Sequence, residues 1–112
     1  MVTKKEFPDR IEYRNDKGIL HREDGPAVEW SDGSKEWYIK GELHREEGPA
    51  REWLNSTKEW CINGQYHRED GPAREFADGT KLWFLNGKSY SEQQWQQEVI
   101  KIKLQRLKSY GN

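Results

Sequence analysis

Short runs in which apolar and polar residues alternate recur along this chain, and they predict pairs of β-strands. Each pair begins after Gly-Pro and is interrupted by Asp-Gly or by Asn-Ser. Asp-Gly between two alternating runs is a strong signal for a β-hairpin. We therefore expect three short hairpins, formed by 27–30 with 35–39, by 50–53 with 58–62 and by 73–76 with 81–85.

The three hairpins belong to copies of one 23-residue unit. The segments 21–43, 44–66 and 67–89 align without a gap, and ten of the 23 positions are identical in all three. A period of this length is typical of stacked repeat proteins, in which each unit contacts its neighbours. Such a stack needs caps at both ends, and we assign these roles to an N-terminal strand within 1–20 and to a C-terminal helix.

Charge pairing predicts the register of each hairpin. A three-residue loop with a left-handed residue places Glu29 opposite Lys35, and it does the same in the other two copies. A two-residue loop would place Glu29 opposite Glu36, and like charges directly opposite one another destabilise a sheet. We therefore expect the three-residue loop, with Ser56 in the left-handed position of the second copy.

Alternation divides the side chains of the predicted sheet between two faces. We expect the core on the face where Trp is followed two residues later by an aliphatic residue, opposite a small Ala. The members of this ladder are Trp37/Ile39, Trp60/Ile62 and Trp83/Leu85, with Ala27, Ala50 and Ala73.

The other face of the sheet carries aromatic and arginine side chains that change from copy to copy. Trp, Tyr and Arg are the residue types that dominate the binding energy of protein interfaces. The candidate partner-binding residues on this face are Trp30, Tyr38, Arg51, Trp53 and Arg74. The face is more apolar in the last copy, and we expect the C-terminal helix to cover Phe76, Leu82 and Phe84 there.

Residues 91–110 predict the C-terminal helix. Ser91 and Gln94 have the spacing of a capping box, and Gly111 follows as a stop. Acidic residues come early and basic residues late, which complements the helix dipole.

Two apolar stripes lie along this predicted helix. The sheet can cover the first, formed by Trp95, Val99 and Ile102. Two interpretations stay open for the second, formed by Ile100, Leu104 and Leu107. It binds a second copy or a partner protein, or the helix lies deep against the sheet and buries both stripes.

Composition narrows the class of protein. The 112 residues, 1–112, are enough for one domain. Five of the six Trp lie at fixed repeat positions, which argues against the disorder that 35% charged residues would suggest. A net charge of −1 argues against a general nucleic-acid-binding protein, which carries a basic patch. A single Cys and the absence of an apolar leader predict a cytoplasmic protein. No apolar stretch reaches about 20 residues, so we expect no membrane segment.

His21, His44 and His67 recur beside acidic residues and raise the question of a metal site or an acid–base pair. Equivalent residues in neighbouring units lie two strands apart, about 9–10 Å, whereas zinc ligands lie about 2 Å from their metal. The chain also offers no nucleophile or phosphate-binding loop beside them. We therefore expect no metal, cofactor or catalytic residue, and we assign the histidines to turn structure.

The repeat unit resembles MORN-type repeats in four features. These are the 23-residue period, the Asp-Gly turns at 32–33 and 78–79, the aromatic residue that follows each turn, and the Lys-Gly or Asn-Gly before the next unit. A closer variant, in which LHREDGPA alternates with DGxKxWYxNG, resembles arrays found in bacteriophage, bacterial and giant-virus proteins. The resemblance covers about 18–89. It implies a mainly β fold, a single antiparallel sheet of tandem hairpins used as a docking surface, with the helix as a cap.

The function that follows is non-enzymatic protein binding. The resemblance to phage proteins implies one concrete form, a small viral inhibitor that docks on a host defence protein in the host cytoplasm. Two alternatives stay open: single-stranded nucleic-acid binding through the aromatic and arginine face, and a structural homodimer or assembly unit formed through the C-terminal helix.

Overall fold

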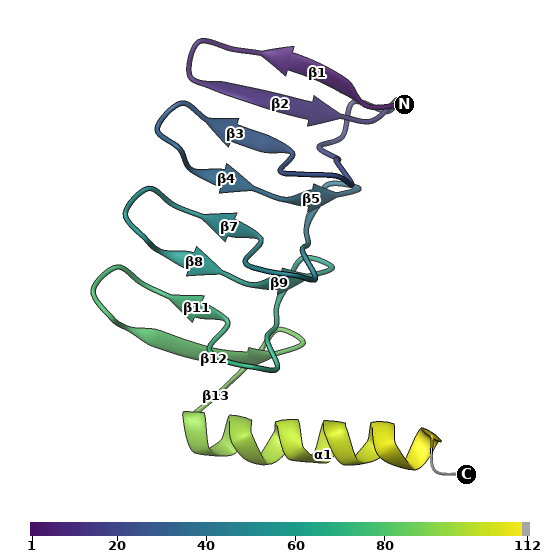
Figure 1. Ribbon diagram of the computed structural model, residues 1–112, viewed down its shortest axis with the longest axis vertical. Helices are drawn as coiled ribbons and strands as arrows, with labels where there is room; N and C mark the ends of the chain where they lie inside the picture. Colours follow the sequence, from purple (N-terminus) through teal and green to yellow (C-terminus); the bar gives the residue numbers. More distant parts are fainter. Residues whose placement is uncertain (111–112) are drawn as a thin grey trace.

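The computed structural model describes residues 1–110 as a stack of hairpins closed by one helix (Figure 1). The elements are β1 (Thr3–Glu6), β2 (Arg10–Arg14), β3 (Val28–Trp30), β4 (Lys35–Glu36), β5 (Tyr38–Ile39), β6 (Glu42–Leu43), β7 (Arg51–Glu52), β8 (Lys58–Glu59), β9 (Cys61–Ile62), β10 (Gln65–Tyr66), β11 (Arg74–Glu75), β12 (Lys81–Leu85), β13 (Lys88–Tyr90) and α1 (Glu92–Tyr110).

Nine strands form an antiparallel sheet in the order β1-β2-β3-β4-β7-β8-β11-β12-β13, and β5-β6 and β9-β10 form two small separate pairs. This arrangement confirms the predicted fold class, a mainly β stack of tandem hairpins with a C-terminal helix. The predicted helix stop, Gly111, lies outside the described residues.

The predicted hairpin register is confirmed in all three copies. Glu29 lies opposite Lys35, and the equivalent pairs hold between β7 and β8 and between β11 and β12. The three-residue loop ends on a left-handed residue, Gly33 at a φ of 99° and Ser56 at 77°. Opposite charges and the loop geometry therefore select the same register.

The second strand of the first two copies is broken, although the sequence predicts it as continuous. In the first copy the break falls at Trp37, whose backbone N–H donates to the Ala50 carbonyl of the next copy at 2.8 Å. β5 then leaves the large sheet and pairs with β6 across the left-handed Lys40–Gly41 turn. In the third copy the strand stays continuous as β12.

At the N-terminal end, β2 pairs with β3 and supplies the N-terminal strand predicted within 1–20. β1 adds an edge strand that the sequence did not predict, joined to β2 through a turn at Phe7–Arg10. All four residues of β1 are exposed. The run Thr-Lys-Lys-Glu therefore lacks the apolar alternation by which the other strands were found.

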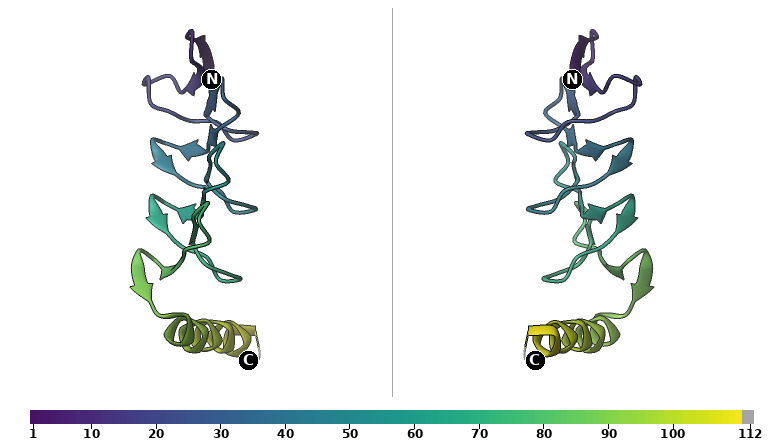
Figure 2. Two further views of the ribbon diagram at one scale, coloured as in Figure 1. Left: turned by 90° about the vertical axis from the view of Figure 1, so that its left-hand side faces the viewer. Right: turned by 90° about the vertical axis from the view of Figure 1, so that its right-hand side faces the viewer.

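The stack is thin and extended. Its dimensions are 49 × 39 × 18 Å, and its radius of gyration is 16.2 Å, against about 13 Å for a compact domain of this length. Edge-on views show the strands stacked along one axis with α1 across the C-terminal end (Figure 2). Most of the sheet has no second layer, so its large side chains must be covered by their neighbours within the sheet.

The invariant turn His-Arg-Glu-x-Gly-Pro supplies part of that cover. The Arg45 guanidinium lies 3.8 Å above the Trp37 ring, and Arg68 lies 3.7 Å above Trp60. Arg68 also donates to the Pro72 carbonyl at 3.0 Å. A Cβ on Gly71 would lie 2.8 Å from the Arg68 guanidinium carbon, so a larger residue there would displace this arginine from its place across the turn.

Each invariant histidine joins two turns of its own unit. Nδ1 of His44 accepts the backbone N–H of Asn63 at 3.0 Å, and His21 and His67 make the equivalent bonds. Asn63 is left-handed, with a φ of 51°. The histidine thus holds the small β9-β10 hairpin against the preceding turn.

The predicted core needs two corrections. Trp37 and Trp60 are only half-buried, because they lie under arginines rather than under a second layer. The main apolar cluster lies at the C-terminal end, where Leu85 packs with Trp95 and Val99 of α1.

The helix also packs on the opposite face of β12 from the one expected. It covers Trp83 and Leu85, whereas Leu82 remains 36% exposed. Phe84 is half-buried and packs against Tyr66 at 5.1 Å between ring centroids, and Phe76 lies under the Arg74 guanidinium at 4.8 Å. Both faces of β12 are apolar in sequence, so alternation alone does not select the side on which the helix packs.

Candidate protein-binding surfaces

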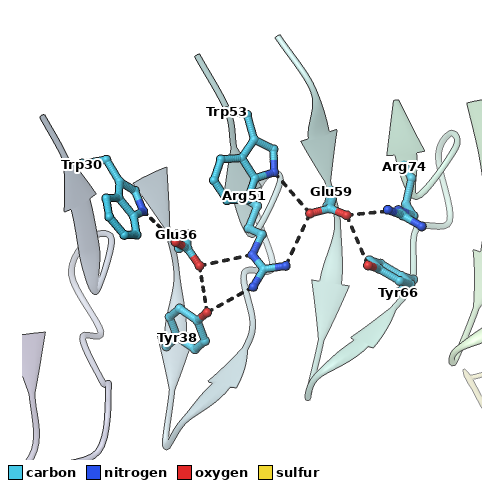
Figure 3. Close-up of polar contacts among 8 residues, drawn as sticks. All are labelled: Trp30, Glu36, Tyr38, Arg51, Trp53, Glu59, Tyr66 and Arg74. Atoms are coloured by element: carbon cyan, nitrogen blue, oxygen red, sulfur yellow. Dashed lines mark hydrogen bonds and ion pairs between the residues drawn. The ribbon is translucent and has the colours of Figure 1, made fainter. Parts of the chain in front are cut away.

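The five candidate residues on the sheet converge on two buried carboxylates (Figure 3). Glu36 is 6% exposed and Glu59 is 4% exposed. They lie on β4 and β8, at equivalent positions of the first two copies. We call these two glutamates and their six donors the carboxylate network: Trp30, Tyr38, Arg51, Trp53, Tyr66 and Arg74.

Glu36 accepts three hydrogen bonds. The indole Nε1–H of Trp30 donates at 2.7 Å, the Tyr38 hydroxyl at 2.8 Å and Nε of Arg51 at 3.2 Å. Two donors come from the first copy, and the arginine comes from the second. A carboxylate that is this buried needs such partners, because a buried unpaired charge is strongly destabilising.

Glu59 repeats the arrangement one unit later. It accepts from Trp53 Nε1 at 3.4 Å, from the Tyr66 hydroxyl at 3.2 Å and from Arg74 Nε at 3.0 Å. Arg51 also lies 3.6 Å from Glu59, so its guanidinium bridges the two carboxylates. The network is therefore continuous across all three copies.

Electrostatics keep the donors in their donating form. Burial, and then the hydrogen bond to Glu36, raise the pKa of Tyr38, so its hydroxyl keeps the proton that it donates.

Burial also raises the pKa of the Cys61 thiol to about 11. This side chain therefore stays protonated and packs as a small apolar residue between strands.

The hydrogen bonds of the carboxylate network fix the positions of its aromatic and arginine side chains, which are partly exposed on one face of the sheet. The five predicted residues are each half-buried, and their polar ends are engaged inside the sheet. What remains for a partner is the outer surface of rings and guanidinium groups that are already held in place. Fixing side chains before binding lowers the entropy cost of forming an interface.

Sequence reasoning missed the two carboxylates at the centre of this surface. The signal was present, because Glu12, Glu36 and Glu59 recur at nearly the repeat period on the face that carries the aromatics. Glu12 is also buried, and it accepts from Arg10 at 2.8 Å and from Arg14 at 3.0 Å. A periodic acid among Trp, Tyr and Arg donors therefore indicates an internal network.

The helix presents a second, separate surface. Trp95 and Val99 are buried against the sheet, as predicted. Ile100, Leu104 and Leu107 are 57%, 53% and 66% exposed. The alternative in which the helix buries both stripes is therefore wrong.

The helix α1 is capped at its start and attached to the last copy near both of its ends. Ser91 and Gln94 form the predicted capping box. Trp95 packs against Trp83 at 4.6 Å and donates through Nε1 to the Arg68 carbonyl at 2.9 Å. Near the other end, the Arg106 guanidinium donates twice to the Glu69 carboxylate, at 2.6 and 2.8 Å, which lowers the pKa of Glu69.

Within residues 1–110, no group of three or more His, Cys, Asp or Glu side chains is placed to hold a metal ion. The one helix of this described part lacks the length of apolar sequence needed to cross a bilayer.

Comparison with protein-family models, curated proteins and solved structures finds no match to this chain. The similarity to MORN-type repeats stays a prediction, and the function is argued from the two surfaces.

Proposed function

We propose that this protein is a non-enzymatic protein-binding module whose main contact surface is the exposed stripe of α1. The observation that carries the proposal is the exposure of Ile100, Leu104 and Leu107 on a helix whose opposite side is fixed to the sheet. Apolar side chains gathered on one exposed face are typical of interaction sites. Helices that bind partners through such a stripe use anchors three and four residues apart.

The outer surface of the carboxylate network supports the same function. It presents Trp, Tyr and Arg, the hot-spot residue types, on a rigid sheet. In the form that the phage resemblance implies, the module is a small inhibitor that docks on a host defence protein.

Protein binding is favoured over single-stranded nucleic-acid binding. Arg51 pairs with Glu36 and Glu59, and Arg74 pairs with Glu59. These buried carboxylates offset the positive charge that would attract phosphate groups.

Affinity capture from a lysate of the cells in which the gene is expressed tests this proposal. The tagged full chain is compared with a variant carrying Ile100→Ser, Leu104→Ser and Leu107→Ser. A matched control carries Leu54→Ser, which removes a 68% exposed leucine from a hairpin tip. We expect the triple variant to lose at least tenfold of the captured partner, while it keeps the melting temperature of the control.

Equal capture of the same partner by the wild type and the triple variant would overturn the assignment of the helix stripe. Capture that is lost only after Trp30→Phe and Trp53→Phe would move the contact to the carboxylate network.

A further inference from the structure

We propose that the partner presents an acidic amphipathic helix, which pairs with α1 as a two-stranded coiled coil. This inference rests on the proposed function and specifies the chemistry of the partner. It follows from the spacing of the exposed stripe and from the charges on both of its sides.

The exposed stripe is part of a longer seam with coiled-coil spacing. Gln93, Gln97, Ile100, Leu104 and Leu107 follow one another at alternating intervals of four and three residues. This is the a/d spacing of a heptad pattern, and all five side chains are exposed. Trp95, Ile102 and Val99 occupy the opposite positions and face the sheet. The fold therefore turns an unpaired coiled-coil seam toward solvent.

Basic residues flank this seam on both sides. The e positions hold Gln94, Lys101 and Lys108, and Gln96 and Lys103 hold two of the g positions. The carboxylates of α1, Glu92 and Glu98, fall at c and b, away from the seam. Glu98 pairs with Lys101 at 2.9 Å in an exposed contact, which contributes little energy.

These flanks select the occupant by charge complementarity. Charges at e and g decide which helices pair in a coiled coil. A second copy of α1 would bring lysine opposite lysine in a parallel or an antiparallel pair, which is unfavourable. A helix with leucine or isoleucine in its seam and glutamate on its flanks would instead form ion pairs along both sides.

The stripe is also narrow for a membrane surface. Helices that lie in the membrane interface carry a broad apolar face with Trp, Phe or Leu. Here Gln93 and Gln97 continue the seam, and the only Trp of α1, Trp95, is 8% exposed against the sheet. The observations therefore favour a helical protein partner over a lipid surface.

A designed peptide tests this chemistry directly. The probe is a fluorescein-labelled peptide of four heptads with Ile and Leu in the seam and Glu at every e and g position, so that it does not pair with itself. Its counterpart carries Lys at those positions. Binding to the full chain is measured by fluorescence anisotropy at 50 and 300 mM NaCl, and the mass of the chain alone is measured by sedimentation.

We expect the acidic peptide to bind at least tenfold more tightly than the basic one, with the difference shrinking in high salt. Leu104→Ser should weaken binding at least tenfold, and Leu54→Ser should leave it unchanged. Gln97→Leu, which extends the apolar seam, should strengthen it several-fold.

Four results would overturn the inference. They are equal binding of both peptides, no binding of the acidic peptide, a dimer in sedimentation that Leu104→Ser dissociates, and binding to anionic phosphatidylserine vesicles in place of the peptide. Failure of the acidic peptide while capture from lysate still depends on the stripe would refute the partner's chemistry alone. Loss of that dependence would refute the proposed function itself.

Discussion

The second and third copies of the repeat cover the same tryptophan in different ways. Trp60 of the second copy lies 3.7 Å beneath the guanidinium of Arg68, which belongs to the following copy. After the third copy the repeat would place another arginine at position 91, but Ser91 begins the helix there. Trp83 is covered instead by Trp95 of α1, at 4.6 Å between ring centroids.

The opposite face of the sheet also differs between the two copies, although the helix does not cover it there. Glu59 of the second copy is buried and accepts from several donors, whereas the third copy has Leu82 at the equivalent position, 36% exposed. A single-layer sheet thus relies on guanidinium–aromatic stacking and buried ion pairs where nothing covers it. Where the helix supplies a second layer, over Trp83 and Leu85, apolar packing replaces the guanidinium stacking.

The largest expected loss of stability comes from removing Trp95, the side chain of α1 that covers Trp83. Trp95→Ala should destabilise the chain by about 3–5 kcal/mol, because it deletes a buried aromatic side chain. Urea denaturation of the full chain measures the change. Leu104→Ala, at an exposed position of the same helix, should stay within about 0.5 kcal/mol of the wild type. A loss for Trp95→Ala below about 1 kcal/mol would mean that apolar packing does not hold the last copy.

A swap between copies tests the polar network next. Glu59→Leu gives the second copy the residue of the third, and it should cost about 3 kcal/mol because Arg51 and Arg74 lose a buried partner. The reverse change, Leu82→Glu, should stay within about 0.5 kcal/mol, because Leu82 is partly exposed. Equal effects of the two changes would remove the distinction between the copies.

The smallest expected effect concerns the ion pair between the helix and the third turn. Arg106, burial and the contact with His67 act on Glu69, and on balance its pKa is lowered from the ordinary value of 4.5. Because the pKa of the folded state is the lower one, this stabilisation is present above pH 4.5 and is lost as the pH falls through the folded value. The melting temperature of the wild type should therefore exceed that of Glu69→Gln at pH 7, and the difference should shrink below pH 4.5. A difference that is constant with pH would contradict this role.

Local patterns predicted the parts of the fold that local contacts decide. The register follows from Glu29 facing Lys35 across a short loop, and the helix start follows from Ser91 and Gln94. The sequence does not decide the exposure of the Ile100 stripe, because one helix with two apolar stripes is compatible with two depths of packing.

The features that the sequence did not predict depend on contacts between copies. At the break, the Trp37 N–H donates to Ala50 of the next unit, and the third copy, which no further copy follows, keeps this strand continuous. The burial of Glu36 requires Arg51, which follows it by 15 residues and becomes its neighbour only in the stack. Glutamate in a charged sequence suggests a solvent-facing position, and only the tertiary partners reverse that expectation.

The buried carboxylates of the first two units each accept a hydrogen bond from the unit that follows. Glu36 accepts from Arg51, and Glu59 accepts from Arg74. Inserting a further 23-residue copy between residues 66 and 67 would therefore recreate every such contact and leave both ends with their present neighbours. Each insertion would move α1 away from β1 by two strand spacings, about 9.5 Å. The number of copies thus acts as a ruler, which sets the separation of the two ends in fixed steps.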